Sequence, residues 1–428
     1  MKLILLFISI IVLLVSILGI YRQISEEKPS IYWLNFKPES HKILQEIGKE
    51  YKEITGRNIN IVTPESGKYS EILTQEMNST SPPTLFIIGD QKSVNKWSDN
   101  LYDLKKTKIA NELNTKEFNL YSNDDKLAAI GYCYETFGII TNIELLEKAG
   151  HKIDEIKDFE TLKTIVEDIH KNAQKLGFDA FTSSGLDPSS SWRFSGHLSN
   201  VPLYYESRDD NWKSSPPTIK GIYLKNYRNI WDLYINNSPY KPDTLLSGEY
   251  NAEEEFGKKQ AVFYQNGNWE YDALVNTYDL EPKKLTMIPL YSGVDGEQNA
   301  GLNSGTENYW AVNSKASDKD IAATLEFMYW LVTDLDISKK LTTVFGSMPY
   351  KKVPKPENIF LAKAQQYIDE GKYIMKWSFT FTPNQEEWRK DVTSALFEYS
   401  KDNSDQKWKE VEYAFIHGWE IQYKAINA

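Results

Sequence analysis

Cysteine and histidine are scarce in this sequence of 428 residues, which contains one cysteine, Cys133, and five histidines. A single cysteine cannot form a disulfide within the chain, and it excludes a metal cluster held by several thiolates. The histidines are scattered without the spacing that metal ligands show. We therefore expect a protein without a metal or another cofactor.

The motifs of several enzyme classes are also absent. The sequence has no G-x-S-x-G nucleophile motif, no H-E-x-x-H zinc motif, no G-x-x-x-x-G-K phosphate loop and no G-x-G-x-x-G dinucleotide fingerprint. Sixty acidic residues supply many candidate carboxylate pairs for glycoside hydrolysis, so a glycan-active enzyme stays open as an alternative. The missing motifs favour a binding protein over an enzyme.

Basic residues are outnumbered, with 49 against 60 acidic residues and a net charge of −11. This balance argues against nucleic acid as a partner. Aromatic side chains are abundant, at 13% of the residues with 12 tryptophans and 27 tyrosines. Tyrosine and tryptophan offer flat apolar faces with a polar rim, which match the faces of sugar rings. A tyrosine-rich hydrophobic core is the alternative explanation.

An uncharged apolar run occupies residues 3–20. As a helix its roughly 18 residues would span about 27 Å, close to the hydrocarbon thickness of a bilayer. The best signal-peptide cleavage site has Ile17 where a small residue is needed. We therefore expect residues 1–24 to form an uncleaved membrane anchor, with a cleaved signal peptide or a buried core helix as alternatives. Residues 25–30 would be a linker, and the weak charge bias places the body outside the cell.

From residue 31 onward, strands alternate with helices. Apolar runs and helical spacing predict strands at 31–36, 58–63 and 84–88, and helices at 39–55 and 68–77. This alternation is typical of a parallel sheet covered by helices on both faces. Ligands of such sheets lie beyond the carboxyl ends of the strands, which are residues 35–37, 65–67 and 89–91.

Strands and helices continue to alternate in the later segments. The pattern predicts two short strands within 126–142, another at 260–264, a region at 179–210 that is irregular where it is not helical, and helices at 143–149, 159–176, 219–235, 253–259 and 316–333. The last eighty residues are helical and rich in tryptophan.

Six blocks of the sequence resemble the extracellular solute-binding protein family 1, the carbohydrate-binding receptors of bacterial ABC importers, a group that includes maltodextrin-binding protein. The blocks are SIYWLNFKPE, EITGRNINIV, PPTLFIIGDQ, ETFGIITNIELLEKAG, QAVFYQNGNWEYDAL and ENYWAVNSKASDKDIAATLEFMYWLVT. Their order and spacing match the family over essentially the whole chain from residue 30. The resemblance implies an α/β, two-lobed periplasmic-binding-protein-like fold of class II. It has two mixed sheets flanked by helices and a hinge between the lobes, here preceded by the membrane helix.

The resemblance also sets the expected lobes. The amino-terminal lobe would hold residues 30–138 plus 312–345, and the carboxy-terminal lobe residues 139–311 plus 346–428. Crossings between the lobes are expected near residues 137–141, 309–313 and 345–349. Crossing strands let a few hinge residues absorb a rigid-body closure around a ligand.

The most specific candidate site is the block Gln265-Asn266-Gly267-Asn268-Trp269. A strand ends there in amides around a glycine, which permits a close approach of the backbone. Trp269 can stack on a sugar while Asn266 and Asn268 bind hydroxyls, although a core tryptophan beside a plain turn is the alternative. In the resembling family the matching tryptophan contacts the sugar.

Other aromatic candidates follow from position in the family pattern. Trp192 and Arg193 stand where the family has an aromatic contact at a helix start, after serines that would cap the helix in any case. Trp388 and Trp377 compete, with Phe379, for the place of a late stacking aromatic. Helical spacing makes core packing the alternative for each of them.

Polar candidates come from the other side of the expected site. Four of these residues, Lys37, Glu65, Asp90 and Glu135, match family positions on the other side of the cleft. Asn35 lies at the end of the first predicted strand, and Glu307 lies in a crossing strand. A carboxylate that accepts sugar hydroxyls makes a charge-assisted hydrogen bond. A solvated surface role is the alternative for each charged residue.

The resemblance implies the substrate-binding subunit of a carbohydrate ABC importer, which captures an oligosaccharide and delivers it to membrane permease subunits. We expect a monomer on the outer face of the cytoplasmic membrane, held by its amino-terminal helix or secreted after cleavage. The lipid-bearing cysteine common in this family is missing, because Cys133 lies far downstream. A sugar sensor coupled to a membrane kinase and a glycan-active enzyme are the alternatives.

Overall fold

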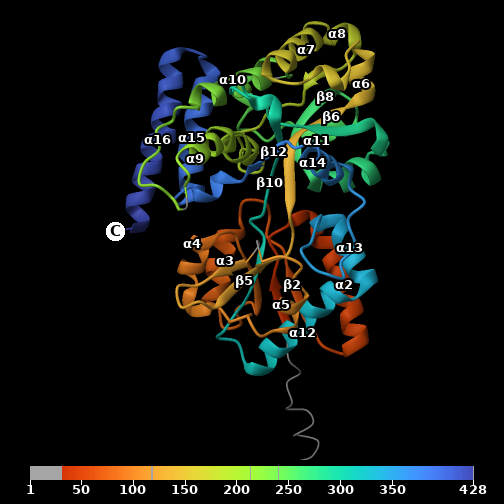
Figure 1. The fold of residues 1–428 in the computed structure, drawn as a ribbon, viewed down its shortest axis with the longest axis vertical. Helices are drawn as coiled ribbons and strands as arrows, with labels where there is room; N and C mark the ends of the chain where they lie inside the picture. The colour runs from red at the N-terminus through yellow and green to blue at the C-terminus, as the bar shows by residue number, and fades with distance from the viewer. Residues whose placement is uncertain (1–30, 117–118, 213, 240, 428) are drawn as a thin grey trace, which may run out of the picture.

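The computed structural model describes residues 31–116, 119–212, 214–239 and 241–427. Two sheets with flanking helices form two lobes that are joined by extended segments (Figure 1). The expected membrane anchor at 1–24 and the linker at 25–30 lie outside the described residues. Within the described part, none of the helices combines the length and the apolar character needed to cross a bilayer.

The first lobe is built on a mixed sheet of six strands. In spatial order they are β2 (Ile59–Val62), β1 (Ile31–Leu34), β3 (Leu85–Ile88), β11 (Tyr309–Val312), β5 (Leu127–Gly131) and β4 (Asn119–Tyr121). Strand β1 pairs in parallel with β2 and β3, whereas β11 runs antiparallel to β3 and β5. Strand β3 is buried along its whole length, as its uninterrupted apolar run predicts.

Helices cover both faces of this sheet. They are η1 (Pro38–Ser40), α2 (His41–Thr55), α3 (Tyr69–Met77), α4 (Gln91–Lys96), η2 (Ser98–Asn100), α5 (Lys108–Glu112), α12 (Asp318–Thr333) and α13 (Leu335–Phe345). Helix α2 buries Leu44, Ile47 and Tyr51 on one face and ends at Gly56, which adopts a left-handed conformation. The three strands and two helices predicted for residues 31–88 are confirmed within about three residues at their ends.

The second lobe holds the other mixed sheet. Its spatial order is β12 (Tyr373–Lys376), β10 (Ala300–Gly305), β6 (Glu135–Asn142), β8 (Ala261–Gly267) and β7 (Asp179–Phe181), with β9 (Leu285–Ile288) also paired to β6. Strand β6 is antiparallel to β8, β9 and β10. Gly138 is required within β6, because a Cβ there would collide with the carbonyl oxygen of Ile288.

The helices of the second lobe are more numerous. They are α6 (Ile143–Lys148), η3 (Ile153–Glu155), α7 (Phe159–Lys171), α8 (Ala173–Leu176), η4 (Arg193–Leu198), α9 (Asn200–Asp209), α10 (Leu224–Asn236), η5 (Pro242–Thr244), α11 (Ala252–Gly257), η6 (Asn268–Glu270), η7 (Ala273–Thr277), η8 (Pro282–Lys284), η9 (Glu297–Asn299), α14 (Ile359–Asp369), η10 (Ser378–Phe381), α15 (Gln385–Lys401) and α16 (Asp405–Asn427). Helices α15 and α16 pack against each other at one side of the lobe (Figure 1). The region 179–210, predicted as irregular where it is not helical, contains β7, η4 and α9.

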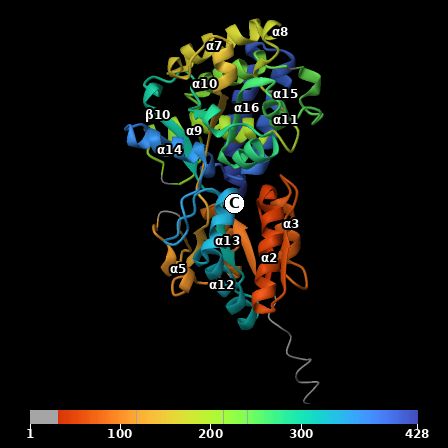
Figure 2. The same cartoon turned by 90° about the vertical axis from the view of Figure 1, so that its right-hand side faces the viewer.

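Three segments carry the chain between the lobes, which lie end to end in the second view (Figure 2). Residues 132–134 join β5 to β6, and residues 306–308 join β10 to β11. The third segment follows α13, where Met348 and Tyr350 still pack in the first core before α14 begins in the second lobe. The backbone N–H of Tyr134 donates to the carbonyl of Ser347 at 2.6 Å, so two of the segments are paired.

Candidate functional site between the lobes

The segments that follow the first-lobe strands touch the second lobe directly. Lys92, in α4 after β3, donates hydrogen bonds to the carbonyl oxygens of Phe381 at 2.8 Å and of Thr382. A Cβ on Gly67, in the segment after β2, would lie 3.4 Å from the carbonyl oxygen of Pro188. Burial lowers the pKa of Lys92 to about 8. The two lobes therefore meet at the strand-end edge where a sheet of this kind binds its ligands.

Lys37 and Glu135 form a buried ion pair in this region. The Lys37 Nζ lies 2.6 Å from a Glu135 carboxylate oxygen and 2.9 Å from Glu39, and Lys37 is only 5% exposed. The amide of Asn308 donates to the other oxygen of Glu135 at 2.8 Å. Burial opposes the charge of Lys37, but the two carboxylates outweigh it and raise its pKa. The ammonium stands 5.9 Å from the ring centroid of Trp269 in the second lobe.

Trp269 provides an aromatic face on the second lobe. It belongs to η6, directly after β8, and its ring lies over Gly267, where any Cβ would collide with it. Trp192 lies beside it, with ring centroids 6.0 Å apart, and donates from its indole Nε1 to the carbonyl of Ser189 at 2.7 Å. Both tryptophans remain partly exposed. The strand end thus offers two adjacent indoles that can receive a flat apolar ligand surface.

His197 completes this aromatic group. It was not among the site residues predicted from the sequence. Its ring stacks on Phe137 with centroids 3.9 Å apart and lies 4.8 Å from Trp192 and 5.5 Å from Trp269. Burial lowers its pKa well below the ordinary value. No signal in the sequence points to this contact, because His197 and Phe137 are distant in the chain and only the tertiary fold stacks them.

A second charged group surrounds Glu307 in the segment between β10 and β11. Burial, followed by the charge of Asp90, raises the pKa of Glu307 to about 8, while Arg389 of α15 opposes the shift. Asp90 is also the N-cap of α4, accepting from the backbone N–H and the hydroxyl of Ser93, both at 2.7 Å. Arg389 donates from Nε to the hydroxyl of Ser195 at 3.2 Å. Glu307 therefore lies where groups of both lobes converge.

Comparison with protein families matches residues 46–358 to the bacterial extracellular solute-binding proteins. The chain belongs to this family. Proteins of this family are located outside the cytoplasm. A comparison with curated protein sequences finds no significant match.

Solved structures with the same fold include sugar-binding proteins. The protein RafE in complex with raffinose aligns with a TM-score of 0.70 and 16% identity, covering 93% of this chain and 100% of that chain. A chitin oligosaccharide binding protein aligns at 0.69 and 18%, covering 93% and 99%. The GacH receptor of Streptomyces glaucescens, also solved with acarbose, aligns at 0.66 and 14%, covering 92% and 98%.

In this solute-binding protein the end of β1 presents Phe36 rather than Asn35. Asn35 is fully buried, and its amide donates to the carbonyl of Lys37 and to the hydroxyls of Ser40 and Thr63, while its expected ligand contact stays a prediction. Phe36 is 41% exposed, with its ring edge-on to Tyr69 at 5.3 Å. Successive side chains of a strand point to opposite sides, and this alternation was the signal available in the sequence.

The amides beside Trp269 stabilise the protein rather than face solvent. Asn268 is buried, and its side-chain oxygen accepts from the backbone N–H of Thr136 at 2.7 Å. Asn266 is buried and donates to the hydroxyl of Tyr264. These hydrogen bonds hold both amides within the protein, and the ligand contacts expected for them stay predictions.

Three further predicted residues belong to the interior of the second lobe. Trp388 is 0% exposed and donates to the carbonyl of Phe415, and its expected stacking role stays a prediction. Arg193 is buried and its guanidinium lies between backbone carbonyls of two strand ends. Trp377 is almost fully buried, with its ring against Gly305. Long-range packing has taken all three side chains away from the surface.

Glu65 lies at the exposed edge of the first lobe. It borders a shallow hollow of about 320 Å³ together with Pro64, Lys68, Glu71 and Ile72. Among the described residues, the Glu65 side chain makes no hydrogen bond or ion pair with the second lobe. The neighbouring Gly67 lies close to Pro188 of that lobe.

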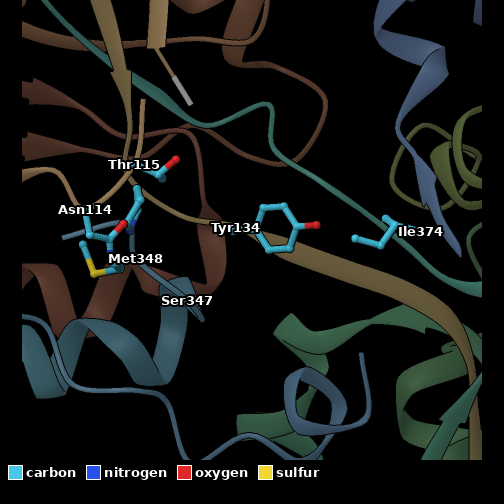
Figure 3. A pocket seen from close by; sticks show the side chains of 7 residues that line it. Asn114, Thr115, Tyr134, Ser347, Met348 and Ile374 are labelled. Carbon is cyan, nitrogen blue, oxygen red and sulfur yellow. The ribbon is translucent and has the colours of Figure 1, made fainter. Parts of the chain in front are cut away.

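A separate pocket of about 220 Å³ lies beside the paired connecting segments. Figure 3 shows Thr115, Asn114 and Met348 on one side, Ile374 of β12 on the other, and the Tyr134 ring between them. Its lining comes from both lobes and from the connections. Its shape therefore depends on the angle between the lobes.

Proposed function

We propose that this protein is the extracytoplasmic substrate-binding subunit of a carbohydrate ABC importer, which captures an oligosaccharide between its lobes and delivers it to a permease. The observation that carries the proposal is the pair of partly exposed, adjacent indoles of Trp192 and Trp269, with the buried Lys37 ammonium 5.9 Å from the ring centroid of Trp269. Sugar rings need both an apolar stacking surface and charge-assisted hydrogen bonds.

The comparisons support a sugar over other solutes. The similar solved structures are those of RafE with raffinose, a chitin oligosaccharide binding protein, and GacH with acarbose. These proteins share the fold over nearly the full length of this chain. Two adjacent aromatic rings favour a ligand with more than one sugar ring.

Capture requires no covalent chemistry. A ligand shifts the equilibrium between open and closed lobes only by its differential affinity for the closed arrangement. The connecting segments 132–134 and 306–308 would absorb that motion. The closed form would then present surfaces of both lobes together, and this joint surface is what a permease can distinguish from the open form.

The membrane association is part of the proposal. We place residues 1–24 as the anchor that keeps the receptor on the outer face of the cytoplasmic membrane. Fractionation of cells that express the full chain tests this point. The intact chain should pellet with membranes and resist washing with high salt, whereas a mature amino terminus near Tyr21 in the medium would show a secreted receptor.

Binding and turnover can be tested together. Isothermal titration of the purified chain with raffinose, maltotriose, xylotriose and chitotriose should show saturable binding of at least one sugar. Chromatography after prolonged incubation should recover that sugar unchanged. Steady formation of products would establish the glycan-active enzyme instead, and absence of binding to every sugar would overturn the proposal. Co-purification with a membrane kinase in place of a permease would identify a sensor.

A further inference from the structure

His197 is held in a fixed orientation within the aromatic group of the second lobe. It belongs to the π-helical turn η4, and its ring is parallel to that of Phe137, with an interplanar angle of 6°. Trp192 meets it edge-on at 79°, and Trp269 is tilted by 55°. The residue retains 8% exposure. A ring packed in this way cannot rotate freely, so its two nitrogens have defined and different surroundings.

One of these nitrogens is engaged by the protein. The side-chain amide nitrogen of Gln265 lies 3.3 Å from His197 Nδ1. Gln265 is fully buried at the end of β8. With this orientation of the Gln265 amide, its N–H donates to Nδ1, and the single proton of a neutral imidazole is then carried by Nε2.

The other nitrogen is available. Among the described residues, Nε2 of His197 makes no hydrogen bond, and it is not one of the fully buried polar atoms. The ring stays neutral, because burial and the positive charges of Arg389 and Arg193 lower its pKa well below the ordinary value. The other side chains that pack on it, from β6, β8, η6 and η10, are uncharged.

We propose that His197 donates a hydrogen bond from Nε2 to an acceptor oxygen of the bound sugar, and that Gln265 fixes the tautomer that makes this possible. The inference rests on the proposed function and adds a specificity-determining residue to it. The indoles of Trp192 and Trp269 recognise any ring with an apolar face. A single oriented N–H beside them distinguishes rings by the position of one oxygen, which stacking cannot do.

The tautomer can be measured directly. In protein labelled with ¹⁵N-histidine, five imidazole pairs are expected, and the His197 pair is identified by its loss in His197→Gln. In the free protein at pH 7, Nε2 should carry the proton and Nδ1 should not. Adding the tightest-binding sugar among raffinose, maltotriose, xylotriose and chitotriose should shift the Nε2 signal and leave the Nδ1 signal nearly unchanged.

Two substitutions separate the donor from the packing of the ring. His197→Phe keeps the stacking on Phe137 and removes the donor, so we expect about tenfold weaker binding of the same sugar. His197→Gln places an N–H at the same distance along the side chain and should recover most of the affinity. Equal melting temperatures of the sugar-free variants would show that the loss is not one of folding.

The outcomes distinguish this inference from the proposed function. A proton on Nδ1, an Nε2 signal unmoved by saturating sugar, or equal affinity in His197→Phe would overturn the role of His197 while sugar binding stands. If the phenylalanine and glutamine variants lose affinity equally, the ring packs the site without donating, and the inference also fails. If none of the four sugars binds the unaltered protein, the proposed function fails and this inference fails with it.

Discussion

The two lobes meet with chemically different surfaces. The strand ends of the first lobe present the charged groups Lys37 and Asp90, and Lys37 pairs with Glu135 at the start of β6. The second lobe presents the rings of Trp269 after β8 and of Trp192 and His197 at η4. Neither surface alone satisfies a sugar, because its hydroxyls need hydrogen-bond partners and its ring faces need apolar contact. The difference explains why affinity would depend on closure, since only closure brings both surfaces to one ligand.

Breaking the charged surface should produce the largest effect. Glu135→Ala leaves the Lys37 ammonium buried without its main partner, so we expect a loss of about 3–5 kcal/mol in the free energy of unfolding. The double variant Lys37→Met/Glu135→Leu removes both charges and should recover most of that loss. Urea denaturation followed by circular dichroism measures both. A single variant as stable as the unaltered protein would contradict the assignment of a buried ion pair.

Breaking the aromatic surface should affect binding rather than stability. Trp269→Ala removes a partly exposed stacking face, and we expect sugar affinity to fall by about 2–3 kcal/mol, roughly thirty- to a hundredfold. Titration calorimetry gives the change. Trp330→Phe alters a partly exposed tryptophan against Tyr51 in the first lobe and is the matched control, expected to bind normally. Full affinity in Trp269→Ala would place the ligand elsewhere.

The junction between the surfaces should make binding depend on pH. Burial raises the pKa of Glu307 to about 8 in the arrangement with the lobes together, and separation would rehydrate it and return the pKa toward its ordinary value near 4.5. The closed form then binds more protons than the open form. Sugar affinity should therefore rise as the pH falls from 8 toward 5, by at most about tenfold per pH unit. This added affinity is lost as the pH rises through 8.

Titrations from pH 5.5 to 7.5, below the range in which Lys92 would titrate, should show a flat profile for Glu307→Gln. Glu270 is the control, because burial and Glu253 raise its pKa to about 8 mainly within the second lobe. Glu270→Gln should retain the slope of the unaltered protein. A slope that persists in Glu307→Gln would assign the pH dependence to another group.

The smallest effect on binding is expected at the edge of the first lobe. Phe36 is the exposed aromatic side chain among otherwise polar strand ends, so Phe36→Ala should weaken sugar binding about two- to fivefold and change stability by about 0.5 kcal/mol or less. Ile54→Ala, which alters another exposed apolar residue of the first lobe, is the control for binding. A loss as large as that of Trp269→Ala would show that the first lobe also stacks on the ligand.

The sequence was most informative where the signal is local. The strands at the start of the first lobe, α2 and α12 follow from apolar runs, helical spacing and terminal glycine or serine residues. The block around Trp269 was recognisable because a strand, a glycine and an indole lie within a few residues. The region 179–210 was harder, because its β7, η4 and α9 are stabilised by contacts with distant segments rather than by periodicity.

The sequence by itself determined the family, the alternation of strands and helices, and the strand-end segments at which the lobes meet. The tertiary structure alone decided which side chains of those segments face outward. Trp388 and Trp192 are both tryptophans beside a helix start, yet α16 covers the first and leaves the second partly exposed. Exposure depends on which distant element packs against a residue, and His197 became a candidate only when the fold stacked it on Phe137.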